Sequence, residues 1–348
     1  MVINIVVPTI GASGGIDVIY KYVELFINRG HDVCVYKELK ASNMHRYKSK
    51  TKNKIHQGYC TLKSIIMRNK YCNDVDKFVW KITDKTVRNA DVIIATAWPT
   101  SFIIANLSEC KGKKFYFIQD YETWDNVEYV KNSYKLPLKK IVISGWINNC
   151  LKADLGIGPF PIVHNGIDMN IYHLNKQKNL NENSFLMLNH KLPKKGVKYG
   201  LEVFEIIKER IPNCKLRMFG MCDGSNLPEY VEYYQNPSRE KIIELYSNSK
   251  FFIFPSIEEG WGLTPLEAMA CGCIVFGTST GFILDIGVDN ENVMISAPKD
   301  VEGMVKNIER CINDFALSEK ILKNSYNLVK TLDWNDSADK FIYYLKID

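Results

Sequence analysis

The sequence lacks any apolar run that approaches the roughly 18 residues needed to cross a bilayer, so it is not typical of an integral membrane protein. It also lacks an internal repeat with a period of about 20–50 residues and a low-complexity tail, which argues against a solenoid or a propeller. Residues 1–10 lack the basic flank of a secretory signal, and we expect them to contain a first strand instead. What remains is an ordinary globular composition, with 46% hydrophobic and 24% charged residues.

Paired cysteines are also scarce. Of ten cysteines, only Cys271 and Cys273 lie close together in the sequence. Disulfide frameworks and structural zinc sites need cysteines at regular, paired spacings, so this pattern indicates reduced and mostly buried thiols. We therefore expect a cytoplasmic protein.

Acidic residues are absent from one stretch. Residues 41–70 contain none, although the whole chain has a modest net charge of +6. The basic residues of this stretch are Arg46, Lys48, Lys50, Lys52, Lys54, Lys63, Arg68 and Lys70. One interpretation is a solvated face or loop. The other is a landing site for anionic lipid head groups or a lipid-diphosphate acceptor, at roughly 1 kcal/mol per basic residue, which would place the protein peripherally at the inner face of a membrane.

The second half of the chain is organised around residues 251–273. A short aromatic run, Phe251 to Phe254, is typical of a buried parallel strand. A loop with two glycines follows. Thr264 is then predicted to cap a helix, with Pro265 at its first position and Glu267 completing a capping box. A strand, a glycine-bearing loop and a helix N-terminus in this order predict a site for a phosphate, because backbone N–H groups and the positive end of the helix dipole converge there.

Two carboxylates, Glu259 and Glu267, flank this turn. The segment EGWGLTPLEAMACG, from Glu259 to Gly272, resembles the E-x7-E signature of the retaining glycosyltransferases of family 4, which have the GT-B fold. The resemblance implies that Glu267 holds the ribose of a sugar nucleotide. It also implies that Glu259 and the backbone after it hold the donor sugar, through Gly260, Trp261, Gly262, Leu263 and Thr264. The alternatives are that Glu267 only caps its helix and that Glu259 is an ordinary loop acid.

The same family grips the donor diphosphate with an Arg and a Lys in the loop after the strand Phe185 to Leu188. Lys195 matches the Lys of that pattern, and His190 stands in the Arg position unless the alignment slips and Lys191 fills it. A histidine does the work of an arginine only when it is protonated, so we expect turnover to decline on the alkaline side if His190 has this role. Gly220, at the end of the following strand, is also expected on the donor side.

The start of the chain reads as a strand, a glycine turn and a helix, with Gly14 and Gly15 in the turn. This turn resembles the opening of family 4 enzymes, where a glycine loop faces the cleft between the domains. By itself it could also be a dinucleotide fingerprint. The third glycine of that fingerprint is missing, however, and no acid ends the second strand, which disfavours a Rossmann oxidoreductase.

Two further strands of the first half end in polar or aromatic residues. Trp98 follows residues 91–96, and Asp120, Tyr121 and Glu122 follow residues 114–119. Ligands of open parallel sheets bind outside the carboxyl ends of the strands, so we expect these four residues to border the acceptor side of the cleft. The acids at 74 and 76 fall between segments expected to be helical, and they are interpreted as surface residues rather than metal ligands.

The sequence thus predicts an α/β protein of the GT-B class, with two doubly wound, Rossmann-like domains facing across a cleft. The expected domains are residues 1–165 on the acceptor side, residues 166–332 for the donor nucleotide, and a final helix over 333–348 that returns to the first domain. The predicted activity is transfer of a sugar from a nucleotide-diphosphate sugar to a glycan or lipid-linked acceptor, with retention, without a metal or other cofactor and without a nucleic-acid partner. The alternatives are a sugar-nucleotide epimerase of the same fold and a catalytically weak sugar-nucleotide-binding protein.

Overall fold

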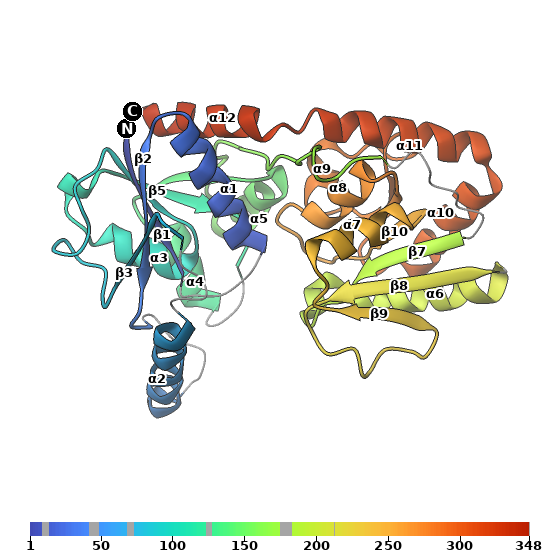
Figure 1. Cartoon of the computed structure of the whole chain (residues 1–348), viewed down its shortest axis with the longest axis horizontal. Coiled ribbons are helices and arrows are strands. Elements are labelled where there is room, and N and C mark those ends of the chain that lie inside the picture. Colours follow the sequence, from blue (N-terminus) through green and yellow to red (C-terminus); the bar gives the residue numbers. More distant parts are fainter. Residues whose placement is uncertain are drawn as a thin grey trace. The chain divides into compact units, whose positions relative to one another are not determined.

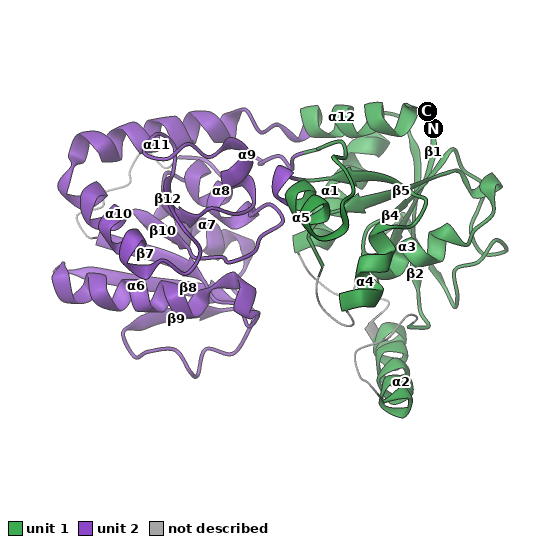
Figure 2. Ribbon diagram, turned by 180° about the vertical axis from the view of Figure 1, so that it is seen from behind, with its two compact units in different colours: residues 1–143, 147–163, 335–348 green, residues 144–146, 164–334 purple. Residues whose placement is uncertain are grey.

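The computed structural model describes residues 1–8, 14–41, 49–67, 73–122, 127–174, 183–211 and 213–347. The predictions for Arg46, Lys48, Arg68 and Lys70 lie outside these residues. The chain divides into two compact units (Figure 2). Unit 1 consists of residues 1–143, 147–163 and 335–348, and unit 2 of residues 144–146 and 164–334.

Unit 1 contains, in the part of the chain that is described, a six-stranded parallel sheet with the order β3-β2-β1-β4-β5-β6 (Figure 1). Its strands are β1 (Val2–Val7), β2 (Asp32–Glu38), β3 (Asp76–Val79), β4 (Val92–Ala95), β5 (Lys113–Ile118) and β6 (Lys139–Val142). The helices that go with it are α1 (Gly14–Asn28), α2 (Lys50–Met67), α3 (Trp98–Ala105), α4 (Val127–Tyr134), α5 (Gly145–Leu155) and α12 (Trp334–Lys346). The central strands are mostly apolar and buried because helices cover both faces of a parallel sheet.

The last helix, α12, belongs to the core of unit 1 although it comes from the end of the chain. The ring of Phe341 lies 5.0 Å from that of Tyr22 and 5.5 Å from that of Phe26, both on α1. It also lies 4.7 Å from the ring of Phe117 on β5. The contacts with Tyr22 and Phe26 are edge-to-face, and that with Phe117 is tilted. Such aromatic contacts stabilise the packing beyond area burial alone, so they hold the C-terminal helix against the first sheet.

Asp76 departs from the expectation that it lies on the surface. It begins β3, and its side chain has an exposed fraction of 0%. Its carboxylate accepts hydrogen bonds from Lys37 Nζ at 2.7 Å and from the Tyr20 hydroxyl at 2.6 Å. The prediction was wrong because β3 has only four residues and begins with two polar ones, Asp76 and Lys77, which gives no apolar pattern in the sequence.

Unit 2 repeats the architecture. Within its described residues it has a six-stranded parallel sheet with the order β12-β11-β10-β7-β8-β9, so the predicted pair of doubly wound α/β sheets is confirmed. The strands are β7 (Asn183–Leu188), β8 (Cys214–Gly220), β9 (Val231–Gln235), β10 (Phe251–Phe254), β11 (Ile274–Thr278) and β12 (Met294–Ser296). The helices are α6 (Val197–Arg210), α7 (Arg239–Ser247), α8 (Leu263–Ala270), α9 (Phe282–Ile286), α10 (Val301–Asn313) and α11 (Phe315–Lys330).

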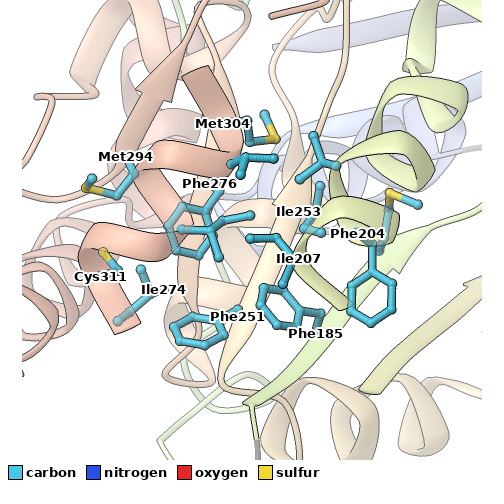
Figure 3. Packing of buried hydrophobic residues seen from close by; sticks show 14 of the residues in the cluster. Phe185, Phe204, Ile207, Phe251, Ile253, Ile274, Phe276, Met294, Met304 and Cys311 are labelled. Atoms are coloured by element: carbon cyan, nitrogen blue, oxygen red, sulfur yellow. The ribbon is translucent and has the colours of Figure 1, made fainter. Parts of the chain in front are cut away.

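The core of unit 2 fixes the edge at which its site is built. Figure 3 shows Phe185, Phe251 and Phe276 packed side by side, each from a neighbouring strand. The ring of Phe251 lies 4.9 Å from that of Phe185 and 5.5 Å from that of Phe276. Because parallel strands end at the same edge of a sheet, this packing brings the loops after β7 and β10 together.

In the described residues, no helix combines the length and the apolar character that crossing a membrane needs.

Candidate functional site

The turn between β10 and α8 keeps the physical basis of an anion site, but its details differ from the prediction. Helix α8 begins at Leu263, with Gly262 as its N-cap at φ 95°. The predicted cap at Thr264 and the capping box with Glu267 are therefore wrong, because Thr264 and Pro265 already lie in the first helical turn. A glycine cap offers no side-chain acceptor to the first N–H groups of the helix. These groups and the helix dipole remain suited to a phosphate.

Lys195 and Glu259 form an ion pair beside this turn. Lys195 Nζ lies 2.6 Å from Glu259 Oε2, and the two side chains are only 20% and 14% exposed. Ser256 Oγ donates a second, longer hydrogen bond to the same carboxylate oxygen, at 3.4 Å. The structure thus brings together two predicted site residues that are far apart in the sequence.

Backbone contacts fix the place of Lys195. The carbonyl oxygen of Lys194 accepts hydrogen bonds from the N–H groups of Ile257 at 2.7 Å and of Glu258 at 3.3 Å, which ties the loop after β7 to the loop after β10. Gly196 follows at φ 66°, and a Cβ there would lie 1.9 Å from the carbonyl oxygen of Pro255. Only glycine fits this close approach. The ammonium group of Lys195 is therefore positioned by main-chain geometry.

The loop after β11 supports Glu259 from the other side. Thr280 Oγ1 accepts a hydrogen bond from the N–H of Glu259 at 3.0 Å. Gly281 has φ 56°, and a Cβ there would lie 2.4 Å from the carbonyl oxygen of Trp261 and 3.1 Å from Glu259 Cγ. The glutamate is thus held at its main chain and at its side chain, and this is the preorganisation that a binding or catalytic carboxylate needs.

Trp261 lies inside unit 2 rather than at its surface. Its side chain is only 2% exposed, and its ring stacks on that of His164 at 4.5 Å. His164 Nε2 in turn lies 2.9 Å from Asp285 Oδ2. The indole Nε1 is buried and has no hydrogen-bond partner among the described residues. The side chain of Trp261 is therefore not available for the predicted contact with a donor sugar.

His190 lies close to the ion pair, since the charges of Lys195 and Glu259 both act on it. Burial, and then the charge of Lys195, lower the pKa of His190. Its Nδ1 accepts a hydrogen bond from the N–H of Leu192 at 3.0 Å, which leaves Nε2–H as the ring's donor. The unliganded protein therefore carries a neutral imidazole here, and a bound diphosphate has to overcome both effects before His190 becomes a cation. The neighbouring Lys191 is exposed.

Glu267 meets tyrosines instead of capping α8. The hydroxyl of Tyr246, on α7, donates a hydrogen bond to Glu267 Oε2 at 2.9 Å. Burial, and then the charge of Glu267, raise the pKa of Tyr246 well above its ordinary value, so this hydroxyl stays a donor. The same two causes raise the pKa of Tyr172. The carboxylate is thus oriented by neighbours that its own sequence segment does not contain.

Gly220 has a packing role. It ends β8, and a Cβ at this position would lie 2.2 Å from the carbonyl oxygen of Asn189, where the loop after β7 begins. The main chain is also joined there, by a hydrogen bond from Asn189 N–H to the carbonyl of Phe219 at 2.7 Å. The small residue lets the loop that carries His190 and Lys195 pass over the end of β8.

Comparison with protein families identifies unit 2. The model for the family "Glycosyl transferases group 1" matches residues 169–328. The match spans less than half of the chain, and it assigns residues 169–328 of unit 2 to this family. CapM of Staphylococcus aureus, a capsular polysaccharide biosynthesis glycosyltransferase, is 28% identical over 230 residues. The match covers 60% of this chain and 59% of CapM, so the chain spans less than two thirds of that relative's length.

Solved structures resemble this chain over nearly its whole length. HepE of Anabaena, solved in complex with UDP, superposes with a TM-score of 0.76 at 13% identity and 99% coverage of both chains. The sucrose-phosphate synthase of Thermosynechococcus elongatus does so with a TM-score of 0.73 at 14% identity and 98% coverage of both. At these identities the likeness shows the fold alone, and that fold is GT-B, as predicted.

In unit 1, two of the predicted acceptor-side residues are joined directly. The main-chain N–H of Trp98 donates a hydrogen bond to Glu122 Oε2 at 2.8 Å. The rings of Trp98 and Tyr121 are only 1% and 6% exposed, and Tyr121 donates to Asp154 at 2.6 Å. Asp120 is half-buried. The two buried rings therefore present little surface for the predicted contact with an acceptor, whereas Glu122 and Asp120 are half-buried.

Gly14 and Gly15 begin helix α1 of unit 1. A Cβ at Gly15 would lie 3.7 Å from the side-chain Nε2 of Gln119, at the carboxyl end of β5. The residues before Gly14 in the predicted glycine loop lie outside the described part of the chain. The glycines therefore share one edge of the first sheet with the residues that follow β5.

Several residues of the site were missed by sequence reasoning. Tyr246 and Tyr172 reach Glu267 from other elements, and no motif marks them. His164 was also missed. Its position immediately before the Asn165-Gly166 pair is the sequence feature that could have pointed to it. Across the described ranges, no group of three or more His, Cys, Asp or Glu side chains could hold a metal ion.

Glu267→Gln is expected to weaken binding of a nucleoside diphosphate about tenfold or more, because hydrogen bonds to a charged group contribute roughly 1.5–3 kcal/mol. The glutamine oxygen can still accept from Tyr246, so the melting temperature should not change. Calorimetric titration with UDP measures the affinity, and Glu302→Gln, an exposed glutamate on α10, is the matched control. An unchanged affinity would leave Glu267 with a structural role only.

Proposed function

We propose that this protein is a retaining, metal-independent glycosyltransferase that moves a sugar from a UDP-sugar to a glycan or lipid-linked acceptor. The observation that carries the proposal is the Lys195–Glu259 ion pair beside the N-terminus of α8. Glu267 lies farther along α8, where Tyr246 of α7 donates a hydrogen bond to it. UDP is the proposed nucleotide because HepE binds it, and CapM supports a role in polysaccharide biosynthesis. The proposed localisation is the cytoplasm, peripherally at the inner face of a membrane.

The proposed reaction breaks the bond between C1 of the donor sugar and the diphosphate oxygen, and the bonding electrons leave with the diphosphate. Lys195 and the first N–H groups of α8 stabilise that negative charge. Glu259 orients the hydroxyl groups of the sugar as it becomes oxocarbenium-like. The acceptor hydroxyl then bonds to C1 on the same face, and its proton passes to the leaving phosphate oxygen.

A second candidate is a sugar-nucleotide-binding protein with low turnover. It rests on His190, whose neutral imidazole replaces a permanent cation in the grip on the diphosphate. This candidate predicts nucleotide binding without measurable transfer.

Nucleotide binding is the direct test. UDP at about a hundred times its dissociation constant should stabilise the protein by roughly 2.7 kcal/mol, and GDP and dTDP should stabilise it less at the same concentration. Thermal unfolding with each nucleotide measures this, and incubation with UDP-sugars and acceptor glycans then reports transfer. Stabilisation by UDP without transfer would favour the binding protein, whereas no response to any nucleotide would refute both candidates.

A further inference from the structure

Helix α2 of unit 1 has a polar face that is buried or half-buried. Gln57, Thr61 and Ser64 share one side of the helix because they are four and three residues apart. Ala41 N–H donates to Thr61 Oγ1 at 3.0 Å, Gln57 donates to the Ala41 carbonyl, and Ser64 is only 3% exposed. Polar side chains therefore make the hydrogen bonds that join α2 to Ala41.

The opposite side of α2 is apolar and exposed. It carries Ile55, Tyr59, Leu62 and Ile66, which recur every three or four residues and form one stripe. Their exposed fractions are 69%, 63%, 58% and 69%. A contiguous exposed apolar stripe of this kind marks an interaction surface, because folding alone would place these residues inside.

The charge around the stripe is of one sign. Helix α2 contains four lysines and no acidic residue, and two of them, Lys52 and Lys63, lie along the edge of the stripe. Two copies of α2 packed together would bring these lysines close to one another without a counter-charge. A partner surface with an apolar interior and negative charge complements α2 better than a second copy does. An anionic lipid layer has both properties.

We propose that α2 docks this protein onto an anionic lipid surface, with the stripe Ile55, Tyr59, Leu62 and Ile66 in the boundary between head groups and acyl chains. Lys52 and Lys63 then lie against the lipid phosphates. The helix lies on the membrane in this arrangement and does not span it. The proposal goes beyond clustered charge, since it assigns part of the affinity to apolar burial, and it stands independently of the transfer activity.

Cosedimentation with vesicles tests the proposal. The full chain should bind vesicles that contain phosphatidylglycerol more tightly than vesicles of phosphatidylcholine alone, and binding should weaken as salt rises. The double variant Ile55→Ser, Leu62→Ser should partition about tenfold less or lower still, at both low and high salt. The double variant Lys52→Gln, Lys63→Gln should lose about fivefold per lysine at low salt, with a smaller loss at high salt.

The matched control is Phe315→Ser, which removes a side chain that is 78% exposed on α11 and should leave partitioning unchanged. Since the stripe is already exposed, all variants should keep the wild-type circular dichroism and melting temperature. Wild-type partitioning of the Ile55→Ser, Leu62→Ser variant would overturn the proposal. Failure of the wild type to bind anionic vesicles would do so too, and a wild-type dimer lost in this variant would show that the stripe pairs two copies instead.

Discussion

Glu259→Gln is expected to lower turnover about a hundredfold or more while leaving nucleotide affinity unchanged or slightly improved. In the proposed reaction the carboxylate faces the sugar, where charge develops only as the bond to the diphosphate breaks. Loss of the carboxylate therefore lowers turnover and not nucleotide affinity. Glu259 also neutralises Lys195 across 2.6 Å in the unliganded protein. Glutamine keeps the shape and one acceptor oxygen but removes the negative charge, so the ammonium group attracts a diphosphate at least as well as before.

Two measurements separate these effects. Titration with UDP gives the affinity, and initial rates at saturating donor give turnover. Glu258→Gln changes the adjacent glutamate, whose N–H and not its carboxylate joins the loop contact, and it should keep most of the activity. Equal losses of affinity and turnover in Glu259→Gln would show that this residue binds the nucleotide and not the sugar.

The fold was predictable because its signals are local. Phe251 to Phe254 is a short, wholly apolar run, and the other central strands are mostly apolar runs between helical patterns. Such runs are typical of a parallel sheet that helices cover on both faces. Strand β3 was not predicted because it is short and half-buried and begins with Asp76 and Lys77. In the sequence, a polar residue that is buried by pairing with Lys37 cannot be told from a surface residue. Long-range pairing decides its burial, and no local pattern records such a partner.

The candidate site was predictable only for the residues that one continuous segment of the sequence contains. The E-x7-E turn named both glutamates, but the start of α8 was misplaced, because Gly262 at positive φ competes with Thr264 as a cap and the tertiary structure favours the glycine. The partners of the glutamates come from distant elements. Tyr246 reaches Glu267 from α7, and Thr280 reaches Glu259 from the loop after β11. These contacts depend on how the strands are ordered in the sheet, which the sequence does not state.

Lys195→Met is expected to lower turnover by about 10²–10³ and to weaken UDP binding about tenfold or more, because a preorganised cation at the diphosphate is lost. Methionine keeps most of the length and volume of the aliphatic chain. The variant also leaves Glu259, which is 14% exposed, without its cation. Lys198→Met is the matched control, since that lysine lies just beyond the same loop with its side chain 79% exposed and should be replaceable without effect.

The double variant Lys195→Met, Glu259→Gln shows whether the two residues act as a unit. Without Lys195 the carboxylate loses the contact that orients it, so much of its contribution should already be gone in the single variant. We therefore expect the double variant to be about as slow as Lys195→Met alone, and more stable to heat than it, because no unpaired half-buried charge remains. If the two losses multiplied instead, Lys195 and Glu259 would act independently, and the ion pair of the unliganded protein would have no part in orienting the glutamate for the reaction.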